Sequence, residues 1–85
     1  MPEEEVGRVT HYFTKLGVGV VEITKSILSV GDTIHIKGHT TDLTQKIESM
    51  EIEHEPVQSA KAGQSIGLKV KEHVREHDVV YKVLE

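Results

Sequence analysis

Apolar and polar residues alternate along most of this chain with the two-residue period of β-strands. The clearest example follows the Gly31-Asp32 pair, where in residues 33–37 two isoleucines alternate with three polar residues before Gly38. Gly31 can adopt a positive φ without a Cβ penalty, and Asp32 can hydrogen-bond its own backbone at the bend. The pattern predicts a tight turn that leads into a strand with one buried and one solvated face.

Alternating or continuous apolar character marks six short segments, each bounded by turn residues. No helical apolar period persists for ten residues, apart from one short turn at Val57–Ala62 after Pro56. Two hairpin connections are expected, at residues 14–17 and 38–42. The six predicted strands are Val6–Phe13, Gly17–Thr24, Thr33–Lys37, Gln45–His54, Ser65–Lys71 and Val79–Leu84.

The fourth segment changes its alternation phase, because Ile47 belongs to one phase whereas Met50 and Ile52 belong to the other. Such a slip indicates a β-bulge, and a bulge bends a strand so that a small sheet can close on itself. We therefore predict an all-β fold, a small closed six-stranded Greek-key β-barrel with a filled interior. Residues 6–85 are expected to form this single domain, preceded by an acidic flexible N-terminus at residues 1–5.

The amino-acid composition excludes several classes of site and of cellular location. The 85 residues include no cysteine, which excludes disulfides, thiol nucleophiles and the common structural zinc sites. The amino terminus lacks the features of a signal peptide and no apolar run is long enough to span a membrane, so a cytoplasmic protein without membrane contact is expected. The net charge is −4, but without Glu3–Glu5 the chain has 11 acidic residues against 10 Lys and Arg, a net charge of −1.

Several stretches together resemble a known family. They are Gly7-Arg8-Val9, the run from Leu28 to Gly38, Ile47-Glu48-Ser49-Met50 with His54, and Ala60 to Leu68, in this order over about 75 residues. Their order and spacing are similar to domain 2, the β-barrel, of translational GTPases of the elongation-factor Tu class. The chain departs from that family at Glu76-His77-Asp78, where an Arg-Gly pair is usual.

This resemblance implies a free-standing, translation factor-like binding module that contacts RNA, either tRNA or rRNA, or a translation or RNA-modification protein. It also implies a pocket wall near the tRNA end at the turn that contains Ile27, Leu28 and Asp32. No Gly-x-x-x-x-Gly-Lys-Ser/Thr loop is present, so neither a nucleotide nor any other cofactor is expected.

The candidate RNA-binding residues are lysines at alternating or strand-end positions. Alternation places Lys69 and Lys71 on one face, and such a stripe can position phosphates or protect a strand edge from aggregation. Tyr12 and Phe13 offer a stacking surface, of which only one side chain can face outward. The full set of lysines is Lys37, Lys46, Lys69 and Lys71.

Two other interpretations remain open. A similar carboxy-terminal barrel accompanies collagenase-like peptidases, so the chain could be a protein-only adaptor that completes a GTPase or a collagenase-like, peptidase-type enzyme encoded on another chain. A metal-dependent activity would require His73, His77 and Asp78 to converge in a loop. No nucleophile, base and acid set is recognisable, and the chain itself is expected not to be an enzyme.

Overall fold

Strands make up all the regular structure in the described part of this protein. The computed structural model describes residues 3–84, and no helix occurs in that range. The prediction of an all-β chain is confirmed, and these residues offer no helical segment with the length and apolar character needed to cross a bilayer. The strands are β1 (Glu3–Phe13), β2 (Val18–Ile23), β3 (Ile27–Ser29), β4 (Thr33–Lys37), β5 (Asp42–Lys46), β6 (Met50–Ile52), β7 (Glu55–Val57), β8 (Ser59–Lys61), β9 (Ser65–Lys69) and β10 (Val79–Val83).

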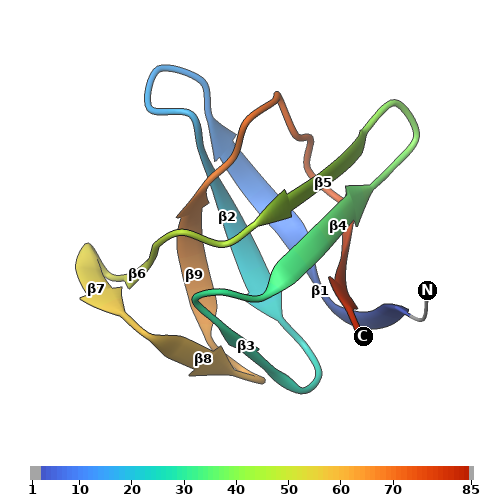
Figure 1. Cartoon of the computed structure of the whole chain (residues 1–85). Helices are drawn as coiled ribbons and strands as arrows, with labels where there is room; N and C mark the ends of the chain where they lie inside the picture. Colours follow the sequence, from blue (N-terminus) through green and yellow to red (C-terminus); the bar gives the residue numbers. More distant parts are fainter. Residues whose placement is uncertain (1–2, 85) are drawn as a thin grey trace.

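Eight of the strands form one antiparallel sheet in the order β5-β4-β10-β1-β2-β9-β6-β7, and β3 pairs with β8 separately. Figure 1 shows how the large sheet curls, so that its two halves face each other across the core. The two predicted hairpins, β1–β2 and β4–β5, are confirmed. The core is built from aliphatic side chains of nearly every strand, including Val21, Ile34, Ile36, Ile66 and Val80.

The prediction of a closed six-stranded barrel is wrong, because the large sheet ends in two edges, β5 and β7. The segment Gln45–His54 was expected to be one bulged strand, but it is two strands with different partners. β5 pairs with β4, whereas β6 pairs with β9 and β7. The change of phase between Ile47 and Met50, both buried, therefore marks a break where the chain crosses from one sheet edge to the other.

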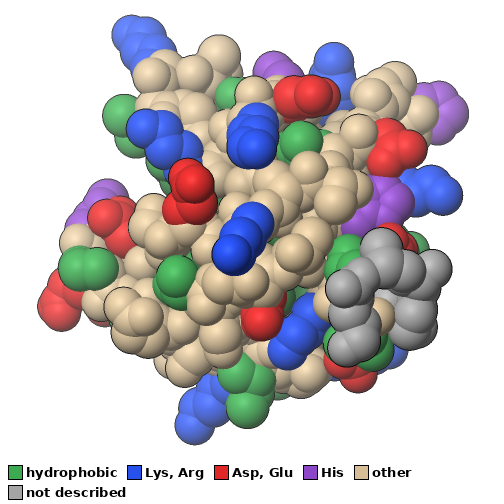
Figure 2. All heavy atoms as spheres, viewed as in Figure 1, with side chains coloured by type: hydrophobic (Ala, Val, Ile, Leu, Met, Phe, Trp, Pro, Cys, Tyr) green, Lys and Arg blue, Asp and Glu red, His purple; other side chains and the backbone are tan. Residues whose placement is uncertain are grey.

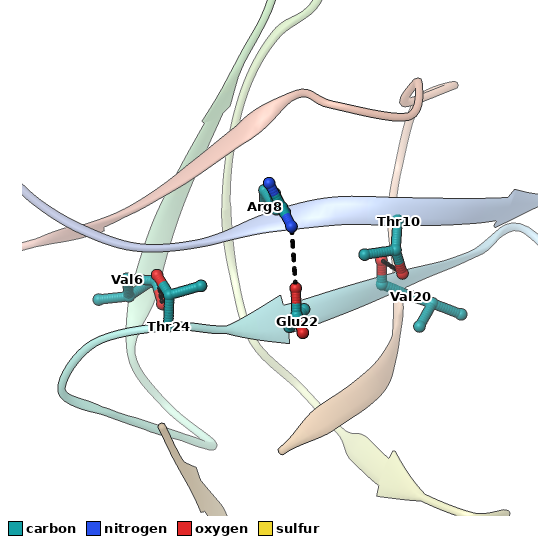
Figure 3. A network of polar contacts seen from close by, with 6 residues as sticks. All are labelled: Val6, Arg8, Thr10, Val20, Glu22 and Thr24. Carbon is teal, nitrogen blue, oxygen red and sulfur yellow. Dashed lines mark hydrogen bonds and ion pairs between the residues drawn. The ribbon is translucent and has the colours of Figure 1, made fainter. Parts of the chain in front are cut away.

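The β-bulges lie in β1 instead. Its register with β10 shifts between Glu5 and Gly7, and its register with β2 shifts between Val9 and His11. Thr10 is the extra residue of the second bulge, and its hydroxyl donates a hydrogen bond to the Val20 carbonyl at 3.4 Å (Figure 3). Because a bulge increases local bending, these two shifts help the long first strand follow the curled sheet.

Strand β1 also begins earlier than predicted. Glu3 and Glu5 pair with Val83 and Tyr81 of β10, so this part of the acidic terminus is strand rather than flexible chain. Residues 1 and 2 of the predicted flexible segment lie outside the described residues. The exposed Arg8–Glu22 ion pair between β1 and β2, 3.4 Å long (Figure 3), adds little to the backbone ladder because both groups remain solvated.

The Gly31-Asp32 turn matches its prediction. Gly31 has a φ of 100°, and the Asp32 carboxylate accepts a hydrogen bond from the Ser29 backbone N–H at 2.8 Å. The strand that follows buries Ile34 and Ile36 and leaves its polar residues on the outer face. The predicted helical turn at Val57–Ala62 is wrong, since this stretch contains the end of β7 and all of β8.

One outward side chain of β4 contacts both β5, its neighbour, and β1, which lies beyond β10 in the sheet. His35 Nδ1 lies 2.9 Å from a Glu3 carboxylate oxygen, and Nε2 lies 2.5 Å from a carboxylate oxygen of Asp42. The hydrogen bond to Asp42, together with the contacts to Glu3 and against partial desolvation, raises the pKa of His35 above its ordinary value of 6.5. Two carboxylates thus hold the protonated imidazole in the folded chain.

A raised histidine pKa makes stability depend on pH. The stabilisation from protonated His35 should be complete below the unfolded pKa and should disappear as pH rises through the higher folded pKa. We expect the difference in unfolding free energy between the wild type and His35→Gln to fall by about 1 kcal/mol or less from about pH 6 to about pH 8. Urea denaturation across this range measures the difference, and a value independent of pH would contradict the assignment.

Candidate functional site

A groove lies at the end of the β1–β2 hairpin. Its volume is about 430 Å³, and it lies between the hairpin and the loop 70–78 that connects β9 to β10. We call it the hairpin groove. The lining residues are His11, Tyr12, Thr14, His73, Val74, Arg75, Glu76 and His77.

Aromatic rings of the hairpin form one wall of the hairpin groove, and one of them meets a ring of the loop. The ring centroids of Tyr12 and His73 are 4.5 Å apart in a tilted arrangement, and those of His11 and Phe13 are 4.5 Å apart edge to face. Since successive side chains of a strand point to opposite faces, Phe13 is largely exposed while Tyr12 packs against the core. This agrees with the prediction that only one of the two can face outward.

The other wall is a loop fixed by backbone hydrogen bonds. The Val70 N–H donates to the Gly17 carbonyl at 3.0 Å, and the His77 N–H donates to the Val9 carbonyl at 2.8 Å. Val74, in the middle of the loop, is fully buried and anchors it to the sheet. The groove is therefore bounded by two segments that hold each other in place.

Asp78 shapes the end of this loop. Its side chain is buried, and its carboxylate accepts a hydrogen bond from the Arg75 N–H at 2.9 Å. The preceding residue, His77, has a φ of 75°, a left-handed conformation that is uncommon for a residue with a Cβ. The carboxylate thus stabilises a strained turn and is not a free ligand.

The metal-site interpretation of His73, His77 and Asp78 gains no support from this geometry. His73 stacks on Tyr12, and Asp78 is engaged inside its own turn. Within residues 3–84 no three histidine, aspartate or glutamate side chains are close enough together to hold a metal ion. The three residues do not converge.

The hairpin also exposes large apolar side chains. Phe13 is 44% exposed and Leu16, in the turn between the two strands, is 65% exposed. Charged Arg75 and Glu76 line the adjoining hairpin groove, together with Thr14 of the hairpin. An exposed apolar centre with a polar rim is the pattern of a protein contact surface.

The four predicted RNA-binding lysines divide into two groups. Lys46, Lys69 and Lys71 line a second hollow of about 270 Å³ between the end of β5 and the end of β9. Lys37 ends β4 beside the β4–β5 turn and does not line that hollow. Lys69 and Lys71 both line the hollow, although β9 ends at Lys69 and Lys71 lies beyond the strand. The approach of Lys46 depends on the curl of the sheet.

The three residues of the predicted pocket turn also lie in different environments. Ile27 is exposed and lines a hollow of about 260 Å³ beside β8. Leu28 is a core residue, and Asp32 closes its own turn and lies 3.4 Å from the Lys82 ammonium group. No joint pocket forms from the three, because β3 points its successive side chains to opposite faces.

Sequence reasoning missed the hairpin groove because its walls are distant in the sequence. His11 and Val74 were not singled out, and no local motif joins residues 11–14 to residues 73–77. Tyr12, His73 and His77 were singled out for other roles, and the departure at Glu76-His77-Asp78 marked this loop as unusual for the family that the chain resembles.

Comparison with known proteins places the chain near peptidases. It is 40% identical over 95% of its length to an uncharacterized protease of Methanocaldococcus jannaschii. It is also 42% identical over 91% of its length to a collagenase of Porphyromonas gingivalis. No family model matches the sequence.

These relatives correct two expectations. The likeness to domain 2 of elongation-factor Tu is wrong as an assignment, because the similar sequences are a protease and a collagenase, and a translation or RNA-binding role is left without support. The expectation that the chain is not an enzyme is also contradicted, since the names of the relatives point to a peptidase.

A solved structure shows the same fold. The C-terminal domain of a protein of Geobacillus thermoleovorans, described as a U32 peptidase, superposes with a TM-score of 0.87 at 24% identity, over 95% of this chain and 93% of that domain. Its selenomethionine variant superposes with a TM-score of 0.85. The chain therefore has the fold of that C-terminal domain, and it spans about a fifth of the length of the curated relatives, 20% of the protease and 22% of the collagenase.

Proposed function

We propose that this chain is an accessory β domain of a peptidase-type enzyme and that its hairpin end contacts the rest of that enzyme. The observation that carries the proposal is the 40% identity over 95% of the chain to only 20% of a protease. A segment that matches almost completely, yet fills so little of its relative, behaves as one domain among several. This is the adaptor interpretation, with a peptidase as the enzyme.

The hairpin end supplies a suitable contact surface. Phe13 and Leu16 present apolar area at its tip, and the hydrogen-bonded loop 70–78 holds the neighbouring polar rim in place. A preorganised surface loses little conformational entropy when a partner binds. The β1–β2 turn lies at one end of β1, and Glu3 lies at the other end (Figure 1). Because Glu3 pairs with Val83, both ends of the described chain lie away from the hairpin.

A reconstitution experiment tests this proposal. The collagenase of Porphyromonas gingivalis is prepared without the segment that matches this chain, and the chain is added as a separate molecule. We expect calorimetry to detect a stoichiometric complex. Replacing Phe13 and Leu16 together with serine should weaken binding at least tenfold, because central apolar contacts carry much of an interface's free energy.

Ile27→Ser is the matched control, since Ile27 is similarly exposed but belongs to β3 and not to the hairpin. This variant should bind like the wild type, and circular dichroism should show that all the variants remain folded. Absence of binding by the wild-type chain would overturn the proposal. Equal binding by the hairpin variant would overturn the assignment of the surface.

A further inference from the structure

Three lysines surround one hollow at the open seam of the sheet. The seam hollow, about 270 Å³ in volume, is lined by Lys46, Lys69 and Lys71 together with Glu48, Ser49 and the buried edge of Val70. None of these three ammonium groups makes an ion pair with a carboxylate among residues 3–84. Figure 2 shows Lys and Arg side chains gathered on the face where β5 approaches β9.

A buried side chain holds the seam in this geometry. β5 and β9 are not paired by their backbones, but Gln45 of β5 spans the gap between them. Its Nε2 donates to the Lys69 carbonyl at 2.8 Å, and its Oε1 accepts from the Lys71 N–H at 2.9 Å. The amide thereby fixes the backbone that carries Lys69 and Lys71 relative to Lys46.

The charge of the seam hollow is opposite to that of the whole chain. Three lysines and one acidic residue, Glu48, line the hollow, whereas the chain has a formal net charge of −4. Like charges held around a small, partly enclosed volume repel each other unless an anion neutralises them. The Gln45 amide is already engaged by backbone, so the ammonium groups and the Ser49 hydroxyl are the groups left to meet a ligand.

We propose that the seam hollow binds a small oxyanion that carries two negative charges. The excess of two positive charges in the lining matches such an ion, and the volume suits a single phosphate group or a short dicarboxylate. Lysine ammonium groups bind these anions as point charges with rotatable donors. The proposal does not depend on the contact between the hairpin end and an enzyme.

A nuclear magnetic resonance titration of the folded chain tests it. Inorganic phosphate and succinate are added separately at constant ionic strength, with sodium chloride as the reference salt. We expect saturable shifts of the backbone N–H signals of residues 45–49 and 69–71 with at least one of the two anions. Saturation by phosphate alone identifies a phosphate group as the ligand chemistry, and saturation by succinate alone identifies a dicarboxylate.

Matched lysine variants show whether the anion binds in the seam hollow. Lys69→Gln combined with Lys71→Gln should raise the dissociation constant at least fivefold. Lys15→Gln combined with Lys25→Gln removes the same charge from exposed positions outside the hollow and should leave the constant unchanged. Shifts that stay linear in anion concentration, or that equal those of sodium chloride, would overturn the proposal, as would equal weakening by both pairs.

Discussion

Leu28→Ala is expected to lower the free energy of unfolding by about 2–5 kcal/mol. Leu28 is 0% exposed, lies in β3 and pairs with Ala60 of β8. Truncation would remove apolar contacts and leave a cavity, because a two-stranded sheet pressed against a close-packed core can collapse only in part. Urea denaturation monitored by circular dichroism measures the loss.

The neighbouring residue provides the control. Ile27 is 53% exposed, so Ile27→Ala should change the free energy of unfolding by only about 0.5 kcal/mol. The pair compares a buried and an exposed position of one short strand, both of which were predicted to line a pocket. A loss for Leu28→Ala no greater than that for Ile27→Ala would mean that β3 does not pack as described.

Gly7→Ala is expected to destabilise the fold by about 2–3 kcal/mol. A Cβ at Gly7 would collide with the Glu22 backbone carbonyl oxygen and would lie 3.1 Å from the Ile23 Cα. Both neighbours belong to the backbone of the β1–β2 ladder, so relief requires movement of a strand rather than of a side chain. Thermal unfolding followed by calorimetry should show a clear drop in midpoint temperature.

Gly67→Ala is the matched control in another strand. A Cβ at Gly67 would meet only Val18 Cγ1 at 3.5 Å, an ordinary contact. This substitution should be nearly neutral. If the alanine variants at Gly7 and Gly67 behaved alike, the close approach of β1 and β2 would be wrong.

Alternation predicted much of the fold because it reports which face of each strand is buried. It located β4 and the hairpins correctly, since their signals are local turn residues and a two-residue period. It missed β3, β7 and β8 because strands of three residues are too short to display a period. It mistook the break after Lys46 for a bulge, since both features change the alternation phase.

The resemblance to a translation-factor barrel has a physical origin. The residues that carried it, such as the Gly31-Asp32 turn and the alternation of β4, are those that a small curled β-sheet needs in order to fold. They constrain the architecture rather than the function. Sequences with different roles can therefore share them, and the likeness to peptidase domains covers the chain more completely.

The candidate surfaces were harder to predict because the curl of the sheet creates them. Tyr12 meets His73 across more than half of the chain, and Lys46 meets Lys69 through the Gln45 bridge. Neither approach leaves a local pattern in the sequence. Lys69 and Lys71 were the exception, since residues two positions apart are close in any extended segment, although β9 itself ends at Lys69.

Exchange of the domain within an enzyme is the most direct test of the proposed role. In the collagenase of Porphyromonas gingivalis, the 78-residue matching segment is replaced by this chain, and collagen degradation is compared with the parent and with a deletion of the segment. An accessory domain of a peptidase-type enzyme should restore activity to within about tenfold of the parent when the deletion lowers it further. A folded chimera that degrades collagen no better than the deletion variant would contradict the role proposed for this chain.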